Sequence, residues 1–325
     1  DTAKILKFNE TYYADQFAGA TPGARLRAGV TFLNGLSTPS VLIVTPGTYE
    51  ISDSSLRIRR SNFTLQGTGW GASIRQTTLH QHVINVKGTP SAQLENIRIT
   101  GLDIKGPSML AGLGVRPDAA IPTYASGIEV TNARNITIDH NHVYNVQYDA
   151  VGALINVQNI WILYNTIDSC YDDGINPGGF PPLAISRNAW IIGNRVSYVR
   201  TTGIHLSADF ENRYVAGNII DRCWRGIDFS RNLNTVVEGN IIMNFGDPSS
   251  SDPNISAYPG GIKYSQDIPG AGIAANNDSL IGIKIVNNYI GNGFDDCTTV
   301  HPAGIFLESG RDILIQGNTV DFDST

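Results

Sequence analysis

Short segments with apolar residues at every second position run along most of the chain and predict β-strands. "NITIDHNHV" (135–143) and "NIWILYNTI" (159–167) show this period, which is that of a strand with one buried face. Similar segments recur at 188–196, 212–220, 234–242, 283–290 and 312–320. Glycine and asparagine, which favour turns, separate them. The chain is therefore predicted to repeat one short-stranded unit.

Each segment carries one asparagine at the same place, and this residue marks the repeat. The anchors are Asn141, Asn165, Asn194, Asn218, Asn240, Asn288 and Asn318. Neighbouring anchors lie 22–30 residues apart, apart from a gap of 48 residues between Asn240 and Asn288. One such unit cannot bury its own apolar face, whereas stacked units can. The prediction is an all-β fold, a parallel β-helix with coils ~4.8 Å apart and a turn ladder of stacked anchor amides.

A second phrase precedes the anchors and sets the register of another strand. It reads "SGIEV" (126–130), "DDGIN" (172–176), "TGIHL" (202–206), "RGIDF" (225–229), "GGIKY" (260–264) and "AGIFL" (303–307), with "DAVGAL" (149–154) in the same slot. Alternation predicts that the isoleucines of this phrase point inward as a ladder: Ile128, Ile175, Ile204, Ile227, Ile262 and Ile305. A second inward ladder comprises Ile138, Ile162, Ile191, Val215, Val237, Ile285 and Ile315. A third comprises Val146, Cys170, Val199, Cys223 and Phe245, which makes Cys170 and Cys223 buried thiols, two coils apart and too distant to bridge.

The two ends of the chain differ. Residues 19–36 have Thr21 as a predicted N-cap, Pro22 at the first helical position, and apolar residues at helical spacing. Residues 1–40 are therefore expected to form an N-terminal segment with a capping helix, and residues 41–325 the β-helix. The sequence ends in mid-repeat, so we expect the chain to continue beyond Thr325 or another domain or subunit to cover that end.

Titratable residues gather on one outward column. The residue after each inward isoleucine faces solvent, and this column reads Glu129, Gly152, Asn176, His205, Asp228, Lys263 and Phe306. The turn position before each glycine reads Ser126, Asp149, Asp173, Thr202, Arg225, Gly260 and Ala303. Insertions flank this strand on both sides, and long loops on a rigid scaffold usually carry binding or catalysis. The pattern favours a walled groove over this column.

The capping helix, "PSVLIVTPGTYEI" (39–51), "NFTLQGTGWGASI" (62–74) and the coils with N-x-Φ-x-G-N together resemble the pectin-lyase-like superfamily of right-handed β-helices. The resemblance covers nearly the whole chain. It implies a right-handed, single-stranded parallel β-helix that acts on polysaccharides, as lyases, polygalacturonase-like hydrolases, uronan epimerases and phage tailspikes of this fold do. It also implies an extracellular or virion-associated location.

Glycoside hydrolysis is the reaction that the column favours. It needs two carboxylates at a defined separation, and "YDDGI" (171–175) resembles the paired-aspartate strand of polygalacturonase-like hydrolases. Asp173 and Asp228 are the preferred acid/base pair, with His205 tuning one of them and Asp149 as a further candidate. Glu129, Asn176 and Asp172 are expected to bind substrate.

Two other reactions remain open. In a Ca²⁺-dependent β-elimination, Lys263 or Arg225 would be the base, and Asp149, Asp172 and Asp173 would be oxygen ligands of the metal. C5-epimerisation is the least favoured of the three reactions. "GINPG" (174–178) lies where uronan epimerases carry an acid and a histidine, but it has Asn176 and Gly178 at those two positions. Without a lyase reaction no cofactor is expected.

Composition limits the kinds of molecule that the protein is expected to bind. With 16% charged residues and a net charge of −6, the sequence argues against nucleic acid, and it has no apolar run of transmembrane length. A second outward stripe contains Trp161, Trp190 and Tyr214, which could stack on sugars. Such a stripe also suits a subunit interface, so a homotrimer is a possibility. The non-enzymatic alternative is a glycan-binding tailspike or adhesin shaft.

Overall fold

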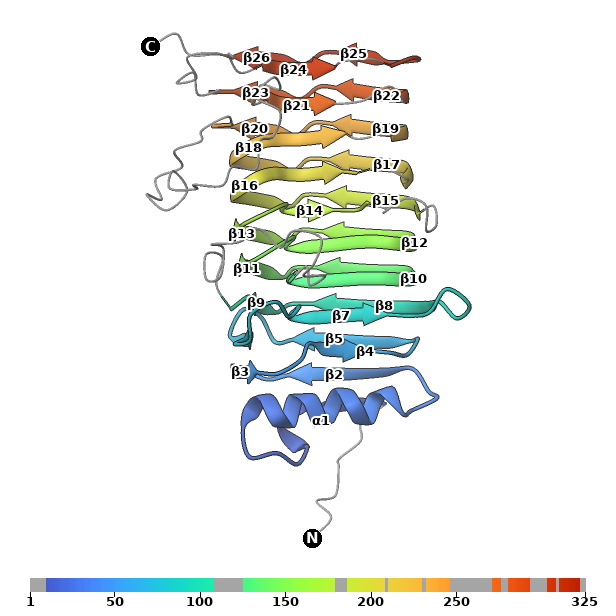
Figure 1. Ribbon diagram of the computed structural model, residues 1–325, viewed down its shortest axis with the longest axis vertical. Coiled ribbons are helices and arrows are strands. Elements are labelled where there is room, and N and C mark those ends of the chain that lie inside the picture. The colour runs from blue at the N-terminus through green and yellow to red at the C-terminus, as the bar shows by residue number, and fades with distance from the viewer. Residues whose placement is uncertain are drawn as a thin grey trace.

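Strands from successive coils pair only in parallel and build three stacks that run the length of the molecule. The computed structural model describes residues 10–107, 125–178, 186–207, 210–229, 232–245, 271–275, 280–292, 303–307 and 310–321. Within these ranges there are 26 strands, and each pairs with the corresponding strand of the next coil. Figure 1 shows the stacks side by side, with the N-terminus at one end and the C-terminus at the other. The prediction of an all-β parallel β-helix is confirmed.

The chain passes through the second, third and first stack in turn, and β10, β12, β16 and β18 bend to take part in two of them. The first stack contains β4 (Leu56–Ile58), β7 (Ile84–Lys87), the early parts of β10 (Ile128–Asp139) and β12 (Val151–Leu163), β14 (Ile175–Asn176), the later parts of β16 (Arg195–Leu206) and β18 (Ile219–Phe229), β21 (Ala271–Ala275) and β24 (Ala303–Leu307). The second contains β1 (Thr11–Tyr13), β2 (Ser40–Val44), β5 (Phe63–Gly67), β8 (Leu94–Thr100), the later parts of β10 and β12, β15 (Ser186–Ile192), β17 (Phe210–Ala216), β19 (Asn232–Glu238), β22 (Ile281–Val286) and β25 (Leu314–Gln316). The third contains β3 (Gly47–Ile51), β6 (Ala72–Gln76), β9 (Asp103–Lys105), β11 (His142–Val146), β13 (Thr166–Cys170), the early parts of β16 and β18, β20 (Ile241–Met243), β23 (Tyr289–Gly291) and β26 (Thr319–Asp321).

The core is made of the inward ladders that alternation predicts, with one correction and one exposed member: Ile315 is in register with Ile285 but is 48% exposed. Ile175, Ile204 and Ile227 lie in register on consecutive coils and are fully buried. On the next coil, however, the partner of Ile227 is Ile273 rather than the predicted Ile262. Both "GGIKY" (260–264) and "AGIAA" (271–275) fit the glycine–isoleucine phrase, and strand pairing selects the second. Residues 260–264 lie outside the described residues.

Glycine precedes the inward residue because the corner between the third and first stacks has no room for a side chain. A Cβ on Gly174 would lie 2.5 Å from the carbonyl oxygen of Gly203 on the next coil. A Cβ on Gly203 would lie 2.5 Å from Ile220 and 2.8 Å from the carbonyl oxygen of Gly226. The glycine of this phrase is therefore required by the close packing of the coils at this corner.

The anchor asparagines form the predicted ladder at the corner between the second and third stacks. Nδ2 of Asn194 donates to Oδ1 of Asn218 (3.0 Å), and the backbone N–H of Asn194 donates to the same oxygen (2.9 Å). Nδ2 of Asn194 also donates to the carbonyl oxygen of Ile162 at 2.9 Å. The same pattern links Asn141 to Asn165 and continues to Asn318. The side chains thus satisfy buried backbone groups where the chain turns.

A second asparagine ladder, which the sequence analysis did not assign, supports the bend before the second stack. Its members are Asn62, Asn96, Asn135, Asn159, Asn188, Asn212 and Asn234, all with φ between 54° and 62°. Each donates Nδ2 to Oδ1 of the preceding member at 2.9–3.2 Å. Asparagine tolerates this left-handed conformation better than other residues with a side chain. The ladder therefore combines a backbone requirement with a hydrogen-bond chain.

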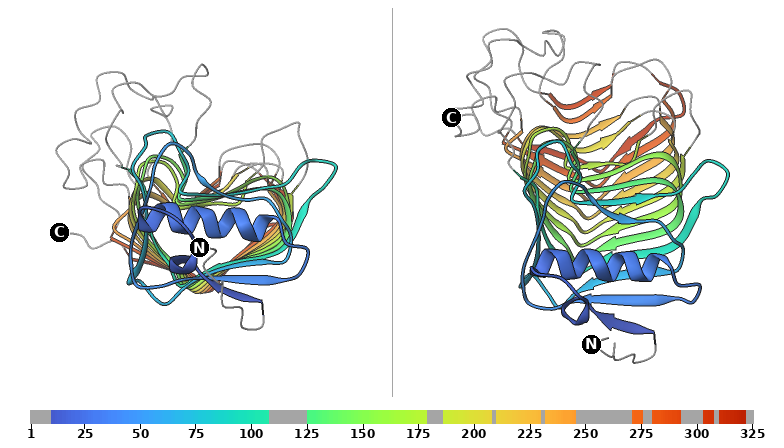
Figure 2. Two further views of the ribbon diagram at one scale, coloured as in Figure 1. Left: turned by 90° about the horizontal axis from the view of Figure 1, so that it is seen from below. Right: turned by 60° about the horizontal axis from the view of Figure 1, so that its bottom comes forward.

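The predicted capping helix is confirmed as α1 (Pro22–Asn34), preceded by the 3₁₀ turn η1 (Ala14–Gln16). Thr21 is the N-cap, and its hydroxyl oxygen accepts from the backbone N–H of Ala24 at 3.1 Å. Leu26, Val30 and Leu33 are buried, and α1 lies across the end of the coils (Figure 2). Among the described residues, no helix is both long and apolar enough to cross a membrane.

Cys170 and Cys223 are free and buried in the third stack, as predicted. Val199 lies between them in register. Burial raises the pKa of the Cys223 thiol to about 12. Both thiols are therefore packing residues, not nucleophiles.

Candidate active site

Two aspartates of adjacent coils meet at the corner between the third and first stacks. The backbone N–H of Gly127 donates to the carbonyl oxygen of Asp149 (3.0 Å), and that of Ala150 to the carbonyl oxygen of Asp173 (3.0 Å). Asp149 and Asp173 therefore occupy equivalent turn positions, as the repeat predicts. One carboxylate oxygen each of Asp149, Asp172 and Asp173 lies within 4.8 Å of the others.

Asp149 is wholly buried. In the described part of the chain neither of its carboxylate oxygens has a hydrogen-bond partner. Burial, and then the charges of Asp173 and Asp172, raise the pKa of this carboxyl well above its ordinary value. At neutral pH Asp149 is therefore either protonated or balanced by a cation. The sequence placed Asp149 on the groove, and the structure puts it beneath the surface.

Asp173 is held by three side chains of the site. Its Oδ2 lies 2.7 Å from Nδ1 of His205, and Nδ2 of Asn176 donates to the same oxygen at 3.3 Å. Its Oδ1 accepts from the Thr201 hydroxyl at 2.6 Å. Burial lowers the pKa of His205, but the contact with Asp173 and the charge of Asp228 outweigh it and raise this pKa to about 9. His205 is therefore an imidazolium at neutral pH, paired with Asp173.

Arg225 and Asp228 extend the site by one coil. Nη1 of Arg225 donates to Oδ2 of Asp228 at 2.6 Å, and both residues are buried. His205 and Asp228 are in register on adjacent strands. Asp173, His205 and Asp228 thus form an alternating row of charges along the first stack. Arg225 is engaged in an ion pair, which works against its use as a base.

Glu129 lies toward the other end of the column, next to a histidine that the sequence analysis missed. Nδ1 of His82 accepts from the backbone N–H of Ser126 at 3.0 Å, so this ring nitrogen carries no proton. Nε2 of His82, the ring nitrogen that carries the proton, lies 3.1 Å from Oε2 of Glu129. Burial lowers the pKa of His82 to about 4 and raises that of Glu129 to about 7. Despite its ion-pair distance, the contact near neutral pH therefore involves a neutral imidazole.

Not every predicted residue joins this site. Lys263 lies outside the described residues, and the place predicted for it in the column is taken by Ala274. The place predicted for Gly260 at the turn is taken by Ala271. Most of the insertions that suggested a walled groove also lie outside the described residues. Phe306 is in register with Ala274, as the column predicts.

The aromatic stripe lies on the second stack, away from the acidic corner. Trp161 and Trp190 stack with their ring centroids 4.9 Å apart and their planes 6° apart. Tyr214 follows in register, and its hydroxyl donates to Glu238 at 3.0 Å. The structure therefore does not bring these three aromatic residues to Asp173. On the next coil, Val236 is in register with Tyr214.

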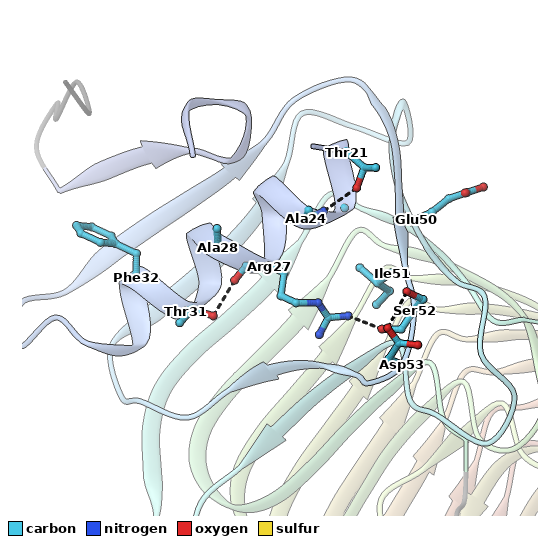
Figure 3. Close-up of a pocket in the computed structure, with 11 residues that line it drawn as sticks. Thr21, Ala24, Arg27, Ala28, Thr31, Phe32, Glu50, Ile51, Ser52 and Asp53 are labelled. Carbon is cyan, nitrogen blue, oxygen red and sulfur yellow. Dashed lines mark hydrogen bonds between the residues drawn. The ribbon is translucent and has the colours of Figure 1, made fainter. Parts of the chain in front are cut away.

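A pocket of about 610 Å³ lies beside α1 at the N-terminal end (Figure 3). Its cation, Arg27, donates to the carbonyl oxygens of Ser52, Ser54 and Ser55 and to the Ser54 hydroxyl. Arg27 thus ties the helix to the first coils. The acidic corner, where titratable groups converge, is the better candidate for chemistry.

Comparison with known proteins gives a consistent fold. A family described as "Right handed beta helix region" matches residues 49–321. No curated protein matches the chain. Among solved structures, a variant of DFA-IIIase from Arthrobacter chlorophenolicus in complex with DFA-III has a TM-score of 0.62 at 15% identity, over 96% of this chain and 84% of that chain.

Phage proteins are also similar in structure. The N-terminal fragment of gene product 12 of bacteriophage Phi29 has a TM-score of 0.63 at 13% identity, over 95% of this chain and 57% of that chain. The Dettilon tailspike protein has a TM-score of 0.53 at 14% identity, over 96% of this chain and 62% of that chain. The chain thus spans about six-tenths of the length of these phage chains. At such identities the likeness shows the fold alone, a right-handed parallel β-helix.

Proposed function

The chain belongs to the right-handed β-helix family, and from that premise we propose that it hydrolyses glycosidic bonds of a polysaccharide along the outer column of the first stack. The observation that carries the proposal is the row of titratable groups on consecutive coils, centred on the 2.7 Å contact between Asp173 and His205. The enzymes and tailspikes among the structural neighbours are compatible with this reading, but fold alone does not assign a reaction.

Asp173 is the base of the proposed reaction. It takes a proton from a water molecule, whose oxygen then attacks the anomeric carbon as the bond to the leaving oxygen breaks. The imidazolium of His205 and the hydroxyl of Thr201 hold the carboxylate in one orientation. Preorganised contacts of this kind reduce reorganisation during the reaction.

Glu129 is a better proton donor than Asp228. The donor must carry a proton at the working pH, and burial raises the pKa of Glu129 to about 7. The protonated carboxyl of Glu129, whose Oε2 lies 3.1 Å from Nε2 of His82, passes its proton to the leaving oxygen. Asp228 is paired with Arg225 instead, and we assign it to stabilising positive charge on the sugar.

The spacing of Glu129 and Asp173 suits inversion of configuration. Glu129, Gly152 and Asn176 are in register on three consecutive coils, and Asn176 donates to Asp173. Two coil steps of about 4.8 Å separate Glu129 from Asn176 by about 10 Å, which is closer to the carboxyl separation of inverting glycosidases, about 6.5–9.5 Å, than to the roughly 5 Å of retaining ones. Gly152, between them, has no side chain to obstruct a sugar and a water molecule.

The test is the release of reducing ends from neutral and uronic polysaccharides. We expect the wild type to release the inverted anomer as its first product. Asp173→Asn and Glu129→Gln should each reduce the rate at least about a hundredfold. Glu95→Gln is the matched control, because Glu95 forms an exposed ion pair with Arg134 on the second stack. Full activity of both acidic-site variants, or no reducing ends from any polymer, would contradict the proposal.

A Ca²⁺-dependent polysaccharide lyase is the second candidate, favoured by the unpartnered oxygens of Asp149. Three carboxylates with oxygens within 4.8 Å of one another fit a hard cation. Asp149, Asp172 and Asp173 would hold the ion, which would neutralise the carboxylate of a uronic acid. Ultraviolet absorbance from an unsaturated uronate, lost on addition of EDTA, would replace the hydrolase with the lyase.

Assembly and location follow the same proposal. The stripe of Trp161, Trp190 and Tyr214 gives three subunits an apolar surface to share, and we propose a homotrimer at an extracellular or virion-associated location. A sedimentation experiment that yields a monomer would refute the trimer. A trimer that binds polysaccharide without cleaving it would make the protein a binding shaft.

A further inference from the structure

We infer that the chain carries a second carbohydrate-binding site, separate from the acidic corner, on the outer side of the third stack. Five rings gather there and at the adjoining corner with the second stack, in two contacting groups: Trp70 with His142 and Tyr144, and His140 with Tyr164. We call this set the ring row. Its ligand is the apolar face of hexose rings in a polysaccharide. This binding does not depend on the proposed hydrolysis.

The rings contact one another across coils that are far apart in sequence. The Trp70 indole lies 5.1 Å from the His142 ring, centroid to centroid, with 33° between the planes. His142 and Tyr144 are stacked at 4.5 Å and 10°. On the other side of Trp70, its Nε1–H donates to the carbonyl oxygen of His140 (3.4 Å), and the His140 ring lies 5.5 Å from that of Tyr164.

Polar contacts hold the rings in place. Asp103 lies below the row: its Oδ1 is 2.8 Å from Nδ1 of His142, and its Oδ2 accepts from the hydroxyls of Ser73 (2.7 Å) and Tyr144 (3.3 Å). At the other end, Oδ2 of Asp139 lies 2.8 Å from Nδ1 of His140. Rings fixed in this way lose little conformational entropy when a ligand binds.

Three rings of the row are exposed, and His142 and Tyr144 are half-buried. Trp70 is 55% exposed, Tyr164 is 56% exposed, and the His140 side chain is 63% exposed. Although His142 contacts the indole, more than half of the Trp70 surface remains accessible to a ligand. An aromatic face is electron-rich and attracts the partly positive C–H groups of a sugar. The Tyr164 ring rests on the backbone at Gly193, where a Cβ would come within 2.5 Å of the ring.

The surroundings of the row favour a sugar over a second protein copy. Charged side chains border the rings: Arg98 pairs with Asp139, and the Lys105 ammonium lies 5.7 Å from the Tyr144 centroid. Protein interfaces are depleted of charged residues at their centre, whereas the carboxylates of Asp139 and Asp103 lie directly against rings of the row. Sugar sites instead combine flat rings with polar groups that can bind hydroxyls. Within the described residues, Nε2 of His142 and the charged rim provide such groups.

Affinity electrophoresis tests the site with starch, β-glucan or galactomannan as neutral probes and polygalacturonate or alginate as acidic ones. We expect at least one gel to retard the protein, and Trp70→Ala to weaken this binding about tenfold. Trp70→Phe should retain most of it. Tyr198→Ala is the matched control, an exposed ring on the same stack outside the row. Neutral and acidic gels distinguish the two kinds of sugar.

Several outcomes would overturn the inference. It fails if no gel retards the wild type, or if Trp70→Ala is retarded as strongly as the wild type. The chain has four tryptophans, so Trp70 fluorescence is the part that Trp70→Phe removes. The inference also fails if acrylamide cannot quench this part and dilution restores quenching, since the row would then be a contact between copies. Asp173→Asn separates the two proposals: retained retardation without hydrolysis supports both, whereas unchanged hydrolysis would refute only the proposed function.

Discussion

Replacing Asp173 with asparagine should lower the pKa of His205 by more than two units. In the wild type this pKa is about 9, against 6.5 for an unperturbed histidine. Burial works in the opposite direction, so the carboxylate of Asp173 provides the main compensation. Asparagine would present either an amide N–H, which requires an unprotonated Nδ1, or a neutral oxygen, which attracts the imidazolium much less.

The magnitude follows from the shift itself. A change from 6.5 to about 9 corresponds to about 3 kcal/mol in favour of the protonated ring. Asp228 and Asp172 also raise the pKa of His205 and remain in the variant, so we expect a value between about 5 and 7. Because the pKa is raised by folding, the stabilisation is fully present below pH 6.5 and is lost as the pH rises through 9.

The assay is an NMR titration of the histidine ring protons between pH 5 and 10. The chain has six histidines, and His205→Gln identifies the relevant signal. Asp221→Asn on the third stack is the control and should leave the titration unchanged. A wild-type signal that titrates near 6.5, or one that stays near 9 without the Asp173 carboxylate, would refute the reasoning. Added Ca²⁺ that lowers this pKa in the wild type would favour the metal site.

Three further predictions address the scaffold and the proton donor. Asn218→Ala leaves buried backbone groups without hydrogen-bond partners and should destabilise the fold by about 3–5 kcal/mol in urea unfolding. Asn212→Gly in the exposed ladder, where glycine tolerates the positive φ, should cost less than about 1.5 kcal/mol, and equal losses would contradict the role of the anchors. Folding raises the pKa of Glu129 from 4.5 to about 7, so the wild type loses stability as the pH rises through this range. The stability of Glu129→Gln relative to the wild type should therefore increase by about 2–3 kcal/mol between pH 5 and 8. A difference in stability that does not change with pH would exclude the raised pKa. Cys170 and Cys223 should react with a thiol reagent only after unfolding, and rapid reaction in the native state would show that the third stack opens.

Local patterns predicted the scaffold well. Alternation within strands and the spacing of anchors such as Asn194 and Asn218 are features of one coil repeated many times. A pattern recognised in one coil therefore identifies the same positions in the other coils. The ladder alignment failed at Ile262, where two phrases fit equally well and only pairing with Ile227 decides. The asparagines of the second ladder, such as Asn135 and Asn159, recur in the sequence at the first position of each segment. Their function depends on a positive φ angle, which the sequence does not specify.

The sequence by itself determined the all-β coil, its inward ladders, its cap and the turn positions that bring Asp149 beside Asp173. Tertiary structure decided the chemistry at those positions. Protonation depends on burial and on neighbours from other coils, as for Glu129 beside His82, 47 residues away. The contact of Trp70 with His142 joins coils 72 residues apart. Strand periodicity fixes which side of the coil a residue faces, but the charges and rings that it meets there are set by how the coils stack.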